Sequence, residues 1–256
     1  MNAPDAPQIA AAVRLHAKTA SLLGVDFLPV SVAAPAPAAS RGGATAVARS
    51  APASAPVVNA SAGDKAAALA ALRARHDAEC PHCTNATAHT RTVFGDGSAE
   101  ARLMFVGEAP GAEEDRQGIP FVGRAGQKLN EMIKAMGLRR EDVYIANVLK
   151  ARPPDNATPT PEEASRCGPY LIEQIRIINP EVIVTLGKPA SNFLLENSAT
   201  MSSMRGHWHE WRGIPLMPTF HPAYLLRSYT PENRRKVWSD LQQVMARLNG
   251  DEAASR

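Results

Sequence analysis

Short apolar runs and amphipathic segments alternate along the chain after about residue 100. Four runs rich in aliphatic and β-branched side chains cover residues 103–106, 143–148, 182–186 and 216–220. Apolar positions at helical spacing fill the intervals at residues 124–136, 161–178 and 188–196. Strands that alternate with helices form a parallel sheet covered on both faces. The pattern therefore predicts an α/β fold, with three αβα layers around a mostly parallel four-stranded sheet.

Residues 1–63 have a different pattern. Residues 8–23 show helical spacing and stop at Gly24, which predicts an accessory helix within residues 1–30 that binds an unidentified protein partner. In residues 31–63, 25 of 33 positions are Ala, Ser, Pro or Gly, a composition typical of a flexible linker. A helix from Asp64 to about Ala78 leads into Cys80. We expect one folded domain over residues 64–249 and a C-terminal tail over residues 250–256.

Charge and cysteine content narrow the class of protein. The chain of 256 residues carries a formal charge of +3, which permits nucleic-acid binding without requiring it. Its three cysteines do not form the paired set of a secreted disulfide framework. No stretch approaches the roughly 20 apolar residues that a membrane span needs. These observations favour a soluble, monomeric, cytoplasmic protein without membrane contact.

Unusual residues follow each predicted strand at its carboxyl end, where α/β sheets bind ligands. Gly107 and Glu108 belong to a Gly/Pro turn, and such a turn is either a plain loop or part of a ligand site. Asn147 suits the edge of a planar base, or simply caps its strand. Phe121 is either a stacking platform or a core aromatic. His221 precedes a proline turn and either stabilises developing negative charge or is structural.

Basic and apolar residues cluster towards the C-terminus. Leu225-Leu226-Arg227 combines side chains that can wedge into a base stack with a cation that can bind phosphate. Residues 205–236 contain six Lys or Arg against two Glu, which favours DNA, although residues 234–236 are equally well explained as a solvated basic helix. The acidic residues 113–115 indicate solvated charge or a helix N-terminus rather than a metal site.

Several motifs in one order resemble family 4 of the uracil-DNA glycosylases. They are Val93-Phe-Gly-Asp-Gly97, Met104-Phe-Val-Gly-Glu-Ala-Pro-Gly-Ala-Glu-Glu-Asp115, Gly118-Ile-Pro-Phe-Val-Gly-Arg-Ala-Gly126, Val143-Tyr-Ile-Ala-Asn-Val-Leu-Lys150, Arg152-Pro-Pro154, Met204-Arg-Gly-His-Trp208 and His221-Pro-Ala-Tyr-Leu-Leu-Arg227. The resemblance covers residues 80–248, and several motifs in register are more specific than one. It implies a DNA repair enzyme that hydrolyses the N-glycosidic bond of deoxyuridine, releasing uracil and leaving an abasic site.

By this resemblance six residues line the uracil pocket: Gly107, Glu108, Glu114, Phe121, Asn147 and His221. The base would flip out of the helix and stack on Phe121, while Asn147 reads its N3–H and O4 edge. His221 would stabilise the uracil anion, and Glu108 would position or activate water. The residues expected to contact DNA are Lys150, Arg152, Arg205, Leu225, Leu226 and Arg227.

The resemblance also implies a [4Fe–4S] iron–sulfur cluster held by four cysteines. This chain offers three, Cys80, Cys83 and Cys167. Ala151 stands where the pattern has the fourth, and alanine cannot coordinate iron. The alternatives are a non-cysteine ligand such as His82 or His89, a three-iron form, another metal, loss of the centre, or three merely buried thiols. We expect an iron–sulfur cluster, either [4Fe–4S] or a variant with a non-cysteine fourth ligand, that shapes the DNA-facing loop.

Two other functions stay open. One is a non-catalytic nucleic-acid-binding module of the same fold, and the other is a glycosylase that acts on a wider set of deaminated bases. The joint presence of Glu108, Asn147 and His221 argues against the module. A uracil-crosslinking relative is disfavoured because residues 150–161 lack the histidine nucleophile of that pattern.

Overall fold

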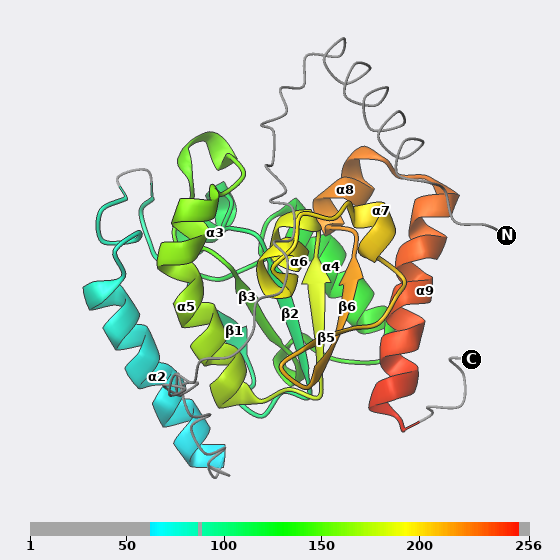
Figure 1. The fold of residues 1–256 in the computed structure, drawn as a ribbon, viewed down its shortest axis with the longest axis horizontal. Helices are drawn as coiled ribbons and strands as arrows, with labels where there is room; N and C mark the ends of the chain where they lie inside the picture. The colour runs from blue at the N-terminus through cyan, green and yellow to red at the C-terminus, as the bar shows by residue number, and fades with distance from the viewer. Residues whose placement is uncertain (1–61, 87–88, 251–256) are drawn as a thin grey trace, which may run out of the picture. The chain divides into compact units, whose positions relative to one another are not determined.

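The computed structural model describes residues 62–86 and 89–250 (Figure 1). The predicted accessory helix, nearly all of the predicted linker and nearly all of the predicted tail lie outside the described residues, so these boundaries stay predictions. Along the described residues, none of the helices is both long enough and apolar enough to cross a membrane.

A six-stranded sheet lies at the centre, in the order β1-β3-β2-β4-β6-β5. The four predicted strands are present and parallel to one another, as β2 (Leu103–Gly107), β3 (Tyr144–Asn147), β4 (Val182–Leu186) and β6 (Ile214–Thr219). Two edge strands, β1 (Asp96–Gly97) and β5 (His209–Trp211), add antiparallel pairs. The prediction of four strands missed these two because they are too short to show a period-two pattern.

Eight α-helices surround the sheet in the described residues. They are α2 (Ala62–Glu79), α3 (Ala112–Gln117), α4 (Arg124–Ala135), α5 (Pro161–Ile178), α6 (Lys188–Leu195), α7 (Met201–Met204), α8 (Pro222–Arg227) and α9 (Pro231–Leu248), with 3₁₀ turns η1 (Arg140–Asp142) and η2 (Pro154–Asn156). Thr160 shows why α5 begins where it does. Its side chain accepts from the N–H of Glu163, whose carboxylate accepts from the N–H of Thr160, which forms a capping box.

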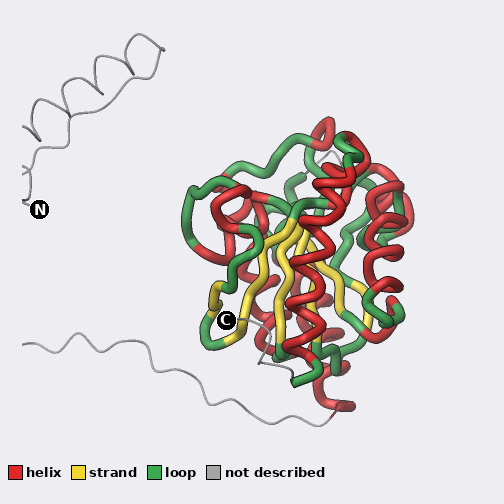
Figure 2. The backbone as a smooth tube through the Cα atoms, turned by 90° about the vertical axis from the view of Figure 1, so that its right-hand side faces the viewer, coloured by secondary structure: helices red, strands yellow, loops and turns green. Residues whose placement is uncertain are grey.

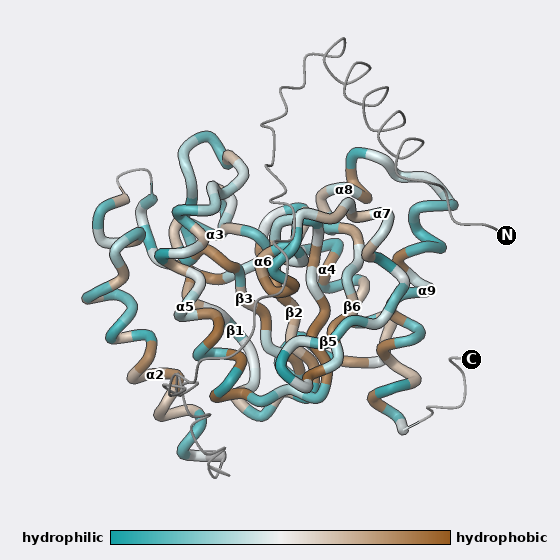
Figure 3. Tube along the Cα trace, viewed as in Figure 1, coloured by the Kyte–Doolittle hydropathy of each residue, from teal (hydrophilic) through white to brown (hydrophobic). Residues whose placement is uncertain are grey.

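The strands bury both of their faces, as predicted for a three-layer fold. Leu103 and Phe105 of β2 pack with α4, α8 and α9, whereas Met104 and Val106 pack with α5 and α6. Helix α2 packs outside α5. Figure 2 shows helices on both sides of the strands, and Figure 3 shows hydrophobic residues along the strands at the centre. The predicted αβα architecture is therefore confirmed.

The carboxyl ends of the parallel strands meet at one edge of the sheet. Gly107 at the end of β2 lies beside Asn147 at the end of β3. On the other side of β2, the Gly187 N–H after β4 donates to the Thr219 carbonyl at the end of β6. The residues that follow these strands are thus brought together from four separate parts of the sequence.

Candidate active site and metal centre

Gly107 allows two buried side chains to pack directly against the end of β2. A Cβ at this position would lie 2.3 Å from Asn147 Oδ1 and 2.5 Å from Phe121 Cζ. Asn147 is 1% exposed, and its Oδ1 has no hydrogen-bond partner among the described residues. A buried amide oxygen without a partner is unfavourable unless a ligand supplies the missing donor. The amide oxygen of Asn147 is therefore available to a hydrogen-bond donor of a ligand at this end of the sheet.

Phe121 lies in a strained loop, and its ring packs against Gly107. Its backbone has φ of 52°, a left-handed conformation that bulky residues rarely adopt and that costs about 1–3 kcal/mol. The ring is buried, and its centroid lies 5.6 Å from that of His221, with 34° between the planes. The predicted stacking residue therefore adjoins both the amide of Asn147 and the imidazole of His221.

Two charged side chains hold the Phe121 loop in place. Glu114 Oε1 accepts from the N–H of Val122 at 2.9 Å and the N–H of Gly123 at 2.8 Å. Arg140 donates to the Phe121 carbonyl at 3.2 Å and the Pro120 carbonyl at 2.6 Å. Glu114 was predicted to line the pocket, and the contacts give its carboxylate the role of a loop anchor. Arg140 was missed, because a lone arginine before a strand gives no sequence signal.

His221 follows β6 and is the N-cap of α8. Its Nδ1 accepts from the Ala223 N–H at 3.1 Å, so the neutral ring carries its proton on Nε2. Burial and, to a smaller extent, the positive charge of Arg227 together lower the pKa of His221 to about 4. His221 is therefore a neutral hydrogen-bond donor at physiological pH.

Glu108 lies directly after Gly107 and is half-buried. Burial raises the pKa of this carboxyl group, while a hydrogen bond from the Thr158 side chain acts in the opposite direction. Glu108 also lies at the edge of a groove of about 870 Å³ between α5 and α6. A carboxylate whose pKa is raised by burial is suited to take a proton from water.

Two residues predicted to contact DNA, Lys150 and Leu225, have buried side chains in this structure. Lys150 is fully buried, and its Nζ donates to the Asn147 carbonyl at 2.7 Å and to Gln174 Oε1 at 2.6 Å. Burial lowers the pKa of Lys150 to about 8, although nearby cysteines act to raise it. Leu225 is 3% exposed and packs in the core with α4, because apolar positions at helical spacing on α8 face inwards.

The other four predicted DNA contacts differ in exposure and in whether their side chains bind other parts of the protein. Arg205 forms an ion pair with the buried carboxylate of Asp240, which also accepts from Thr219 at 2.7 Å, so its cation is engaged inside the protein. Arg152 is half-buried and donates to Asn156 Oδ1 at 2.8 Å. Leu226 is half-buried and Arg227 is exposed, beside the pocket residue His221. Arg152, Leu226 and Arg227 are thus the predicted DNA contacts that are neither fully buried nor held in an ion pair among the described residues.

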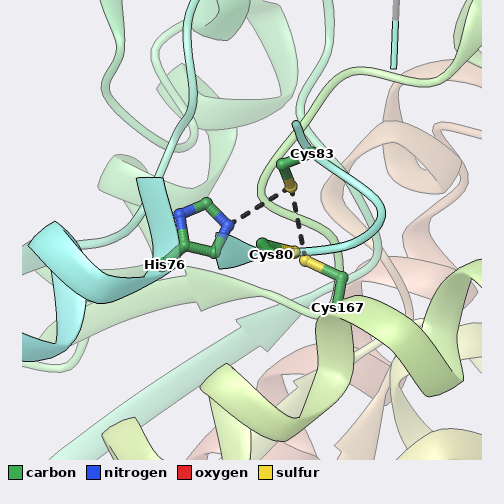
Figure 4. A group of neighbouring side chains, drawn as sticks. All are labelled: His76, Cys80, Cys83 and Cys167. Carbon is green, nitrogen blue, oxygen red and sulfur yellow. Dashed lines mark hydrogen bonds between the residues drawn. The ribbon is translucent and has the colours of Figure 1, made fainter. Parts of the chain in front are cut away.

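The three cysteines come together with a histidine that the sequence analysis missed. Figure 4 shows the donor group, which consists of His76 at the end of α2, Cys80, Cys83 and Cys167 on α5. Their ligand atoms all lie within 4.8 Å of one another, and all four residues are buried. Among the described residues, His82 and His89 are not part of this group. The spacing His76-x3-Cys80-x2-Cys83 was the available signal, because residues four apart share one face of a helix.

Comparison with known proteins agrees with this geometry. The family model of the uracil DNA glycosylase superfamily matches residues 94–242. The chain is 48% identical over 168 residues to the type-4 uracil-DNA glycosylase of Thermotoga maritima, which covers 65% of this chain and 88% of that protein. It is 44% identical over 173 residues to the type-4 uracil-DNA glycosylase of Archaeoglobus fulgidus, covering 64% and 86%. It is also 31% identical over 161 residues to the DNA polymerase of Bacillus phage SP01, covering 62% of this chain and 17% of the polymerase. The chain belongs to the uracil-DNA glycosylase superfamily, and within it to the family of type-4 enzymes.

Proposed function

We propose that this protein hydrolyses the N-glycosidic bond of deoxyuridine in DNA, releasing uracil and leaving an abasic site for base excision repair. The observation that carries the proposal is the unpartnered Oδ1 of Asn147, buried between Gly107 and the ring of Phe121. Uracil offers a donor at N3 and an acceptor at O4 on one edge, which matches the two ends of a carboxamide. Family membership supports the same substrate.

The pocket residues divide the reaction between binding and charge stabilisation. DNA glycosylases turn the target base out of the duplex, and uracil then stacks on Phe121 while Asn147 pairs with N3–H and O4. As the bond from C1′ to N1 breaks, negative charge grows on the uracil ring. The Nε2–H of His221 donates to the O2 oxygen, and a neutral donor stabilises this charge without a proton transfer.

Glu108 serves the sugar side of the same reaction. The departing base leaves an oxocarbenium-like sugar, and a carboxylate beside it stabilises the positive charge. Glu108 orients a water molecule and takes its proton as the water oxygen bonds to C1′. Leu226 and Arg227 fill the gap in the duplex and bind phosphate, and Arg152 contributes a further phosphate contact. No step of this mechanism runs through the His76 and cysteine group.

The test uses the full chain and oligonucleotides with one uracil, single-stranded or paired with G or A. Free uracil is measured by chromatography and abasic sites by alkaline strand cleavage. We expect the Asn147→Asp variant, which keeps the shape but loses the donor, to release uracil at least about 100-fold more slowly. The matched change Asn249→Asp, at an exposed position on the far end of α9, should leave the rate unchanged. Absence of uracil release by the unaltered protein would refute the proposal.

The same assay separates the alternatives. Binding of uracil DNA without release of the base would indicate a non-catalytic module, and release of hypoxanthine or xanthine at comparable rates would indicate a wider specificity. We further propose that the protein acts as a monomer in the cytoplasm, which size-exclusion chromatography and cell fractionation test.

A further inference from the structure

The four donor atoms of the His76 and cysteine group lie within 4.8 Å of one another, close to the spacing around a single metal ion. Around a tetrahedral zinc ion, Zn–S bonds of about 2.3 Å put two thiolates about 3.8 Å apart, and an imidazole nitrogen about 3.6 Å from a thiolate. Cys83 Sγ lies 3.7 Å from Cys167 Sγ and 3.2 Å from His76 Nε2 (Figure 4). In a [4Fe–4S] cluster each cysteine binds a different iron, so the thiolates stand farther apart than around one ion. The close spacing does not fit the cluster implied by the sequence resemblance.

The imidazole of His76 is oriented as a metal ligand. Its Nδ1 lies 2.8 Å from Asp77 Oδ1, so Nδ1 carries the proton and donates it to the carboxylate. This leaves the lone pair of Nε2 directed at the cysteines. A carboxylate behind the imidazole is the usual second partner of a metal-bound histidine, because it fixes the tautomer and strengthens the donor. Thr92 donates to the same Asp77 oxygen at 2.8 Å, which holds the carboxylate in place.

Ala151 explains why the fourth donor comes from α2. The alanine is fully buried and packs in the same apolar cluster as the three cysteines, so its methyl group forms part of the wall of the site. The helix that carries His76 ends at Glu79, just before Cys80. The four donors therefore form a closed Cys₃His set without the position at which the family pattern has its last cysteine.

Charge balance also suits one divalent ion. Three thiolates around a divalent cation carry a net charge of −1, which is costly in a fully buried site unless a cation lies nearby. Lys150 supplies that cation. Its backbone N–H donates to Cys167 Sγ at 3.2 Å, and its ammonium group is buried beside the cysteines.

We propose that His76, Cys80, Cys83 and Cys167 hold one structural zinc ion in place of the four-iron cluster of the family pattern. Cys₃His is a closed tetrahedral set that zinc favours, and it leaves no position for water or substrate. The ion ties the end of α2 and the following turn to α5. This assignment does not depend on the glycosylase activity.

The decisive measurement is the metal content of the full chain, produced with zinc and iron both supplied and purified without oxygen. We expect one zinc per chain, no acid-labile sulfide and no visible absorption. About four irons and four sulfides per chain, a single iron, or no metal would each overturn the proposal. Replacement by Co²⁺ gives an independent readout, with the visible d–d bands of a tetrahedral sulfur-rich site expected.

Variants test the role of the histidine, with zinc affinity measured by competition with a chromophoric chelator. His76→Ala should weaken zinc binding at least about 100-fold, whereas His207→Ala, at an exposed histidine, should not change it. If His76→Ala fails to fold, Asp77→Ala provides the test, because loss of the second partner weakens metal sites by about 10–100-fold. Unchanged affinity in the variant that folds would overturn the assignment of His76 as a ligand.

Discussion

Replacement of Gly107 by alanine tests whether Asn147 and Phe121, which pack on this glycine, belong to the uracil site. The added Cβ would lie 2.3 Å from Asn147 Oδ1, and real Cβ contacts are essentially never below 3.0 Å, so the amide must retreat by about 0.7 Å. The Phe121 ring, at 2.5 Å, must move as well. Both side chains are buried, and overpacking of this kind costs about 1–3 kcal/mol of folding free energy.

The effect on catalysis should be larger than the effect on stability. A misplacement of about 1 Å at a reacting group costs on the order of 100-fold in rate, and the methyl group displaces both Asn147 Oδ1 and the Phe121 ring. We therefore expect kcat/KM for uracil release to fall at least about 100-fold, while thermal denaturation shows a protein that still folds. Single-turnover kinetics on single-stranded uracil DNA, which needs no base-pair opening, measure this directly.

The control is Gly63→Ala in α2, where an added Cβ meets nothing within 4 Å. This variant should keep the activity of the parent protein and be slightly more stable, because alanine favours a helix over glycine. If Gly107→Ala folds and releases uracil within about twofold of the parent rate, the base does not bind between Asn147 and Phe121, and the assignment of the pocket is wrong.

Three further outcomes are expected. The pKa of His221 is lowered to about 4 from an ordinary value of about 6.5, so NMR should show a neutral ring with its proton on Nε2 down to about pH 5. Between about pH 6.5 and 4 the folded state binds fewer protons than the unfolded state. The contribution of His221 to stability is therefore complete above about pH 6.5 and is lost as the pH falls towards 4. Glu114→Gln should release the Phe121 loop, seen as higher hydrogen exchange there and about 10-fold or greater loss of kcat/KM. Lys150→Met should lower the free energy of unfolding by about 2 kcal/mol or more, because Gln174 Oε1 and a backbone carbonyl lose their donor.

Each outcome has a contrary result. A His221 midpoint near pH 6.5, or a proton on Nδ1, would contradict a neutral Nε2 donor. Unchanged exchange in the loop of Glu114→Gln would show that Arg140 holds Phe121 alone. Urea unfolding of Lys150→Met at the parent midpoint would mean that the buried ammonium adds nothing, and Lys134→Met, at an exposed lysine, is the matched comparison.

The sheet and its longer helices could be predicted from the sequence, because period-two and period-3.6 patterns are local. The ends of β2 and β3 were predicted to within one residue, and the two strands bring Gly107 beside Asn147. Side-chain direction was not predictable in the same way. Lys150 and Leu225 stand in motifs that suggest DNA contact, yet helix packing and a buried hydrogen-bond pair turn them inwards.

The group of His76 and three cysteines was also only partly predictable from the sequence. Cysteines at fixed spacing are recognisable in sequence, whereas a histidine ligand depends on which way a helix faces. His76 lies four residues before Cys80, a spacing that α2 carries into the site, but histidines at several positions near the cysteines were equally plausible without the fold. Arg140 was out of reach for a similar reason, because its partners are backbone carbonyls about twenty residues away in the chain.

Lys150 links the cysteine group to the strand that carries Asn147. Its amide faces Cys167, and its side chain holds the carbonyl of Asn147, so a single residue spans the distance between them. An oxidant that attacked the thiols would therefore disturb the strand that recognises the base without touching the pocket.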